Sequence, residues 1–113
     1  MATGKYAELM QKYPFFQKLS RIECGEGWYG LIKNLCAELE KLTLGSSFQV
    51  VQVKQKNGAL RFYVENVPDS KKKVAYSLIQ EAENRSLLTC EECGNPGRLV
   101  IKKLLLKTRC PSC

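Results

Sequence analysis

Four cysteines in the last part of the chain have the spacing of a metal site. They form two C-x-x-C pairs, Cys90 with Cys93 and Cys110 with Cys113, and sixteen residues separate the pairs. This spacing is typical of zinc sites. Four thiolates complete a tetrahedral shell and leave no position for water or substrate. The sequence therefore predicts one structural Zn²⁺ ion, bound by these four cysteines.

Two other kinds of chemistry compete with zinc at these pairs. The second pair, Cys110 with Cys113, resembles half of a rubredoxin knuckle, so iron is an alternative metal. A redox-active pair of the thioredoxin type would need a βαβ unit around it, which this sequence does not predict. Gly94 suits the tight turn of the first knuckle, and Ser86 or Thr89 are candidate hydrogen-bond donors to the sulfurs.

The remaining reactive residue types give no catalytic constellation. The chain has no histidine, which removes Cys-His and Ser-His-Asp catalysis. Cys24 precedes a predicted helix whose dipole could lower a thiol pKa, but no base accompanies it, and both an inert and a reactive thiol stay open. Glu23 and Glu26 are expected as acids near a helix start rather than as a catalytic pair. We therefore expect no enzymatic activity.

A second candidate site is a basic face on a predicted β-hairpin. Asn57-Gly58, a strong hairpin signal, separates predicted strands 48–56 and 59–65. With a two-residue turn, one face carries Val51, Val53, Leu60, Phe62 and Val64, and the other carries Lys54, Lys56, Arg61 and Tyr63. Lys54 should lie opposite Arg61, and like charges so placed are destabilising. This face is a candidate for binding an acidic protein surface or, with Tyr63 stacking on a base, nucleic acid.

Helical spacing predicts three helices that position these sites. The first covers 5–13 and ends before Pro14, and the second carries an apolar stripe from Trp28 to Leu42 that includes Cys36. The third starts after Pro68 and reaches about Leu87, with Val74, Leu78 and Ala82 as its buried stripe. Between the cysteine pairs, the apolar run predicts two short strands joined by a tight turn.

Length and composition indicate one folded unit. A chain of 113 residues with 44% hydrophobic and 26% charged residues fits a single globular domain. We expect an α+β domain over residues 1–113, in which helices pack on an antiparallel hairpin over 1–89 and a zinc ribbon follows over 90–113. The sequence has no apolar run of membrane-spanning length and no signal-peptide pattern, so we expect a cytosolic protein that does not bind membranes.

Positive charge is concentrated at the end of the chain. The formal net charge is +7, and residues 94–113 contain no acidic residue. Four thiolates with one divalent ion contribute −2, so the charge of the zinc-bound chain is about +5. Such a balance permits polyanion binding without requiring it.

Several short motifs together resemble one protein family. They are Gly25-Glu26-Gly27-Trp28-Tyr29, Lys54-Gln55-Lys56 with Gly58, Leu60-Arg61-Phe62-Tyr63, and Thr89 to Gly97 around the first cysteine pair. Their combination resembles a family of small phage and prophage zinc-ribbon proteins. Relatives commonly have Lys-Glu-Lys-Phe-Gly-Gly at 54–59 and a Gly-Trp before the second cysteine pair, both of which differ here. The resemblance implies a mobile-element origin.

The expected function is binding without catalysis. The first hypothesis is an accessory protein that binds a host protein in the host cytosol, as an inhibitor of a defence or transcription complex. The alternative is a nucleic-acid-binding zinc-ribbon module that uses Lys54, Lys56, Arg61 and Tyr63. The oligomeric state does not follow from the sequence.

Overall fold

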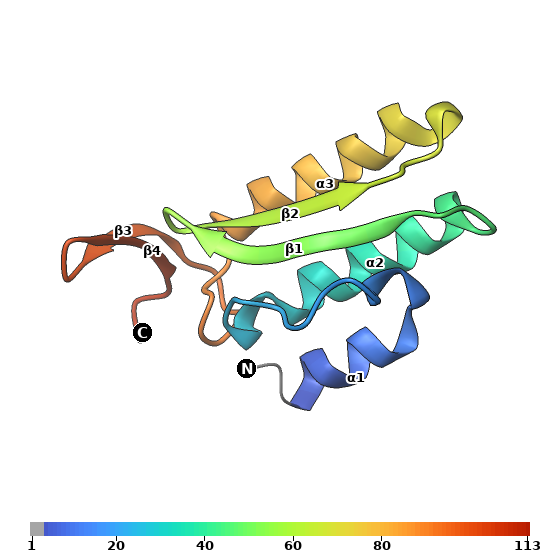
Figure 1. Ribbon diagram of the computed structural model, residues 1–113. Helices are drawn as coiled ribbons and strands as arrows, with labels where there is room; N and C mark the ends of the chain where they lie inside the picture. Colours follow the sequence, from blue (N-terminus) through green and yellow to red (C-terminus); the bar gives the residue numbers. More distant parts are fainter. Residues whose placement is uncertain (1–3) are drawn as a thin grey trace.

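The computed structural model describes residues 4–113 and has the predicted α+β class (Figure 1). Its central helix, α2 (Tyr29–Thr43), buries one stripe at three- and four-residue spacing: Ile32, Leu35, Cys36, Leu39 and Thr43. The Thr43 hydroxyl donates to the Leu39 carbonyl, 2.8 Å away, so even the polar member of the stripe is satisfied. Cys36 is buried in this core, as the sequence predicts.

Strands β1 (Gln49–Lys56) and β2 (Ala59–Glu65) form the predicted hairpin. Asn57 and Gly58 both have positive φ, 54° and 85°, as the tightest two-residue hairpin turns require. The predicted register holds from Lys56 opposite Ala59 to Gln52 opposite Tyr63. Helices α2 and α3 cover one face of this hairpin, and the other face is open (Figure 1).

The prediction that Val51 faces the core is wrong. A β-bulge interrupts the register between Val50 and Gln52. One extra residue moves the side chains before it to the opposite faces. Val50 is therefore fully buried, and Val51 lies on the exposed face.

Helix α3 (Lys72–Ser86) follows a short 3-10 turn, η3 (Asp69–Lys71). Its buried stripe is Ala75, Ile79, Ala82 and Ser86. The predicted contribution of Val74 is wrong, because the helix presents the next residue, Ala75, to the core and leaves Val74 half exposed. Small alanines at this face allow α3 to lie close to the hairpin.

An aromatic cluster closes the end of the core formed by the N-terminal segment. Helix α1 (Gly4–Lys12) and the 3-10 turn η1 (Pro14–Phe16) supply most of it. Phe15 stacks on Tyr13 with ring centres 5.1 Å apart and meets Phe48 edge-on at 5.2 Å. Such pairs add to burial and fix the chain before it reaches α2.

Both outer edges of the first hairpin are covered. Beside β1, the Glu23 backbone donates to Val53 and accepts from Gln55. Beside β2, the Ser86 hydroxyl accepts from the Leu60 N–H at 2.9 Å, and the Glu83 carboxylate accepts from the Phe62 N–H at 3.0 Å. The hairpin therefore offers no free strand edge along these residues.

The last part of the chain forms a second hairpin, as predicted. Strands β3 (Arg98–Lys102) and β4 (Leu105–Arg109) are joined by Lys103 and Leu104. We call residues 90–113, which contain this hairpin and the four cysteines, the ribbon. It lies at the Asn57-Gly58 end of the first hairpin (Figure 1). Among residues 4–113, no helix has the length and apolar character needed to span a membrane.

Candidate metal centre

The structure brings together the four predicted cysteines. Their Sγ atoms all lie within 4.8 Å of one another; the residues are Cys90, Cys93, Cys110 and Cys113. The sulfurs of Cys93 and Cys110 are 3.5 Å apart. In a tetrahedral thiolate shell with bonds of about 2.3 Å, the sulfurs would be separated by about 3.8 Å. The arrangement therefore fits one metal ion, and its ligand set is complete.

Backbone amides support the cluster. Burial raises the pKa of the Cys90 thiol, but N–H groups of Cys110, Cys93 and Glu92 stabilise its thiolate, and the net shift of the pKa is downward. Gly94 turns the first knuckle with a φ of 85°, and its N–H donates to the Cys90 carbonyl at 2.9 Å. Only glycine adopts this conformation without strain, so the predicted role of Gly94 agrees with the structure.

The suggested roles of Ser86 and Thr89 as donors to the sulfurs are wrong. The Ser86 hydroxyl donates to the Glu83 carbonyl, and the Thr89 hydroxyl donates to the Arg85 carbonyl. Both hydroxyls are therefore used at the end of α3. The Ser86 side chain also caps the edge of β2, which explains why it is buried.

A loop from the first part of the chain holds the first knuckle. We call this loop, Gly25 to Trp28, the clasp. The Gly27 N–H donates to the Glu91 carbonyl at 2.7 Å, and the Trp28 indole N–H donates to the Thr89 carbonyl at 2.8 Å. A β-carbon on Gly27 would lie 2.1 Å from the Cys90 carbonyl oxygen, and one on Gly25 would lie 2.4 Å from the Glu91 carbonyl oxygen. The two glycines are thus needed for close backbone approach.

Glu91 links the clasp to both knuckles of the ribbon. Its buried carboxylate accepts from the Gly25 N–H at 2.8 Å and pairs with the Arg109 guanidinium at 3.2 Å. Arg109 also reaches Glu92 at 3.3 Å. Sequence reasoning missed this role. The sequence signal for it was Gly25 and Gly27, which have one residue between them and are followed by Trp28, at a position away from the predicted strand turns.

Cys24 lies beside the clasp without a base or a lowered pKa. Burial, with a smaller contribution from the Glu91 charge, raises the pKa of its thiol to about 12, although the hydrogen bond with Tyr6 opposes the shift. The Tyr6 hydroxyl lies 3.6 Å from the Cys24 sulfur and donates to the Gly25 carbonyl at 2.7 Å. The thiol is therefore protonated at neutral pH, and of the two interpretations the structure favours the inert one.

The basic hairpin face has the predicted composition. Lys54 lies directly opposite Arg61, and Tyr63 lies two pairs further along, on the same face, with 42% of its surface exposed. Lys56 is exposed at the end of β1. Glu23 occupies the register position beside Lys54 on the other side of β1, so an acidic residue of the chain itself adjoins the two cations.

The ribbon carries an aliphatic surface that the sequence did not predict as a site. Its exposed members are Leu99, Ile101 and Leu106 on one face of the second hairpin, Leu105 on the other face opposite Lys102, and Leu104 in the turn. Leu104 is 95% and Ile101 is 72% exposed. Lysines adjoin them at positions 102, 103 and 107.

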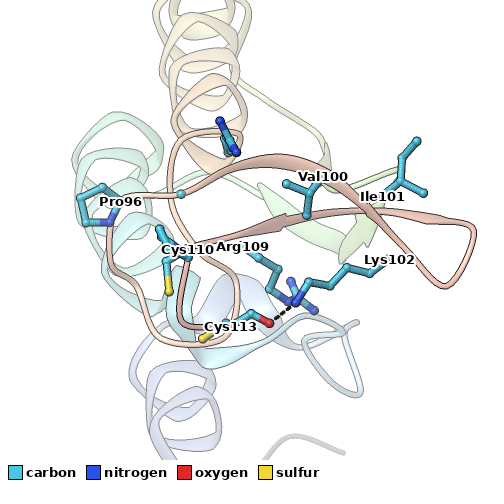
Figure 2. A pocket seen from close by; sticks show the side chains of 10 residues that line it. Pro96, Val100, Ile101, Lys102, Arg109, Cys110 and Cys113 are labelled. Atoms are coloured by element: carbon cyan, nitrogen blue, oxygen red, sulfur yellow. Dashed lines mark hydrogen bonds between the residues drawn. The ribbon is translucent and has the colours of Figure 1, made fainter.

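A cavity of about 580 Å³ lies between β3 and the second knuckle, next to this aliphatic surface. Its lining combines apolar and cationic side chains, among them Val100, Arg98 and Lys102. Figure 2 shows the Lys102 side chain reaching back to donate to the Cys113 carbonyl.

No family model, curated protein or solved structure matches this chain. The family resemblance of its motifs therefore stays a prediction.

Proposed function

We propose that this chain is a non-catalytic zinc-binding accessory protein of a phage or other mobile element, and that it acts by binding a host protein in the host cytosol, for instance as an inhibitor of a defence or transcription complex. The resemblance of its motifs supports the mobile-element setting. The surface of the ribbon supports binding to a protein, and the cysteine cluster supports a structural metal.

Zinc is the metal that best suits the cluster. Four thiolates in tetrahedral arrangement are typical of zinc or iron, and zinc keeps such a site free of redox chemistry. With all four ligands supplied by the chain, the ion has no open position for substrate. Its role is then to hold the two knuckles together, so that the hairpin between them is presented in a fixed orientation.

Leu104 carries the case for protein binding. It is almost fully exposed, and its φ of 66° is a left-handed conformation that favours glycine or asparagine. Neither the exposed apolar side chain of Leu104 nor its left-handed backbone conformation is explained by a contribution to the stability of the isolated chain. Large exposed aliphatic side chains gathered at one place are typical of protein interfaces. A contact with another protein gives this leucine a use.

The experiment is capture of partners from a host lysate with and without nuclease, using the zinc-loaded chain and a Leu104→Glu variant as bait. A host protein retained after nuclease by the first bait and lost by the second is the expected result. If only nuclease-sensitive material is captured, the proposal is wrong. Leu44→Glu, at an exposed leucine after α2, is the matched control.

A second candidate function, nucleic-acid binding, rests on the open face of the first hairpin. Lys54 and Arg61 lie opposite each other with Tyr63 nearby on the same face, and no helix within residues 4–113 covers this face. Cations with an adjacent aromatic ring suit a single-stranded nucleic acid. The ribbon does not extend this surface with stacking groups, since residues 90–113 contain no aromatic residue. We therefore rank it second.

Triple replacement of Lys54, Lys56 and Arg61 by alanine tests that candidate. If the face contacts phosphates, log affinity for an oligonucleotide should become less dependent on log salt, by about two to three in slope for three lost contacts. An unchanged slope removes the first hairpin from the candidate sites. A normal thermal transition would show that the variant folds.

A further inference from the structure

One strand edge in the ribbon is free. Because Lys102 and Leu105 close a two-residue turn, the backbone groups of Leu99 and Ile101 point away from β4. Among residues 4–113, neither takes part in a hydrogen bond with a segment outside the ribbon. An unpaired strand edge is a template for pairing with another extended chain.

The opposite edge of the ribbon is covered. The Thr108 carbonyl accepts from the Glu91 N–H at 3.1 Å, and the Thr108 hydroxyl donates to the Gly58 carbonyl at 2.7 Å. Leu106 lies against the same glycine, because a β-carbon on Gly58 would be 3.3 Å from the Leu106 carbonyl. The first hairpin therefore lies against β4 and, through Gly58, against the Leu99 side chain, and it leaves the backbone edge of β3 accessible.

The two faces of β3 differ in chemistry. Leu99 and Ile101 lie on one face with Leu106 opposite Ile101, whereas Arg98, Val100 and Lys102 lie on the other. The second face borders the cavity of about 580 Å³, whose lining includes the cations Arg98 and Lys102. Arg109 also lines it, but its guanidinium is paired with Glu91 and Glu92. A neighbouring strand would therefore meet aliphatic groups on one side and positive charge on the other.

We propose that an extended segment of the partner protein adds to the edge of β3 as a third strand. This inference rests on the proposed function. The side chains of the added strand alternate between aliphatic and acidic. Its aliphatic side chains lie beside Leu99 and Ile101. Its acidic side chains lie beside Arg98 and Lys102, over the cavity. Backbone hydrogen bonds to Leu99 and Ile101 supply affinity, and the alternation supplies specificity.

The first test uses a fluorescent peptide of alternating valine and aspartate with the intact zinc-loaded chain. Two forms carry N-methyl groups, one on the valine amides and one on the aspartate amides, so that each blocks hydrogen bonding along one edge of the peptide. One form should bind at least about tenfold more weakly than the unmodified peptide and the other should bind as well, because only one edge faces β3. Equal binding of both forms overturns the proposal.

Changing the charge of the peptide tests the acidic half of the proposal independently. Lysine in place of aspartate should abolish binding, whereas a peptide that binds equally well with lysine contradicts the acidic half of the proposal. Displacement of the unmodified peptide by oligothymidylate would indicate that the surface is a nucleic-acid site, which would also overturn it.

The second test removes one donor from the strand edge. Ile101→Pro deletes an N–H that points away from β4, where proline is tolerated in an edge strand. Ile101→Ala is the matched control that shortens the side chain and keeps the N–H. Proline should reduce peptide binding clearly more than alanine, while zinc content and Trp28 emission show that both variants fold. If Ile101→Pro does not fold, the methylated peptides decide with the unaltered chain.

Failure of this inference differs from failure of the proposed function. If the peptides do not bind, but a nuclease-resistant host protein is captured and is lost with Leu104→Glu, strand addition is wrong and protein binding stands. If the lysate yields only nucleic acid, the proposed function fails, and strand addition to a partner protein fails with it.

Discussion

The two hairpins of this chain have similar backbones and different surroundings. Each has a two-residue turn with positive φ at both positions, Asn57 with Gly58 and Lys103 with Leu104. The first hairpin packs one face on α2 and α3 and has both edges covered. The second has exposed residues on both faces and one free edge.

The difference lies in what holds each hairpin. Burial of Val53, Leu60 and Phe62 stabilises the first hairpin, because apolar area leaves water. A two-stranded hairpin with little buried area is marginal in water. We therefore expect the second hairpin to depend on a metal bound by the four cysteines at its base and on the clasp. Freed from core packing, its strands can present side chains to a partner.

Metal removal should produce the largest difference between the two hairpins. Structural zinc contributes about 10 kcal/mol or more to the folding of small metal-dependent units. Chelation should therefore unfold the ribbon, while the first hairpin and its helices keep their secondary structure. The measurement is far-UV circular dichroism with the emission of Trp28, the only tryptophan, whose indole loses its partner Thr89.

Elemental analysis should give the matching positive result, one zinc per chain. A folded chain without metal would contradict the comparison, and so would a disulfide between the pairs. Cys90→Ser should lose the metal, and Ser112→Ala, within the second knuckle, is its control. Cys36→Ser is not a suitable control, because Cys36 is a core residue.

Trp28→Ala should be the most damaging single truncation at the junction. The side chain is fully buried and also bonds the ribbon through Thr89, and aromatic truncations in a core cost about 3 to 5 kcal/mol. Tyr29→Ala should cost less, because Tyr29 is only partly buried and packs on Tyr6 at the rim. Equal losses in urea unfolding would show that the junction does not depend on Trp28.

Gly27→Ala isolates the clasp. The new methyl group would overlap the Cys90 carbonyl, and forced overpacking costs about 1 to 3 kcal/mol. Gly30→Ala is the matched control, because a β-carbon there meets nothing within 4 Å and alanine favours the helix by about 1 kcal/mol. We expect opposite shifts of the thermal midpoint. Equal shifts would mean that the clasp does not need glycine for close approach.

The sequence predicts well what local rules determine. The spacing of apolar residues gives α2, the Asn57-Gly58 turn gives the first register, and the cysteine spacing gives the metal cluster. Each of these depends on residues that are neighbours along one element or on a known ligand pattern. Their positions therefore follow without knowledge of the tertiary structure.

What the sequence does not predict depends on contacts between distant segments. Nothing local marks the bulge that exposes Val51, and the phase of α3 at Val74 is decided by packing on β2. The bonds of Glu91 to Gly25 and Arg109 join three segments. The free edge of β3 becomes visible only once β4 is known to be the covered strand.

The smallest expected effect comes from giving the second hairpin the turn of the first, by the double change Lys103→Asn with Leu104→Gly. Both residues now have positive φ, 50° and 66°, and left-handed backbone costs ordinary residues about 1 kcal/mol each. Because Leu104 buries almost nothing, stability should stay unchanged or rise slightly, as measured by urea unfolding at saturating zinc. Partner capture should nevertheless weaken, since the exposed leucine is lost. The matched change Asn57→Gly, at the turn of the first hairpin, should leave capture unchanged. A clear loss of stability in the double variant would mean that Lys103 and Leu104 support the ribbon itself, and the two hairpins would then differ less than their surfaces indicate.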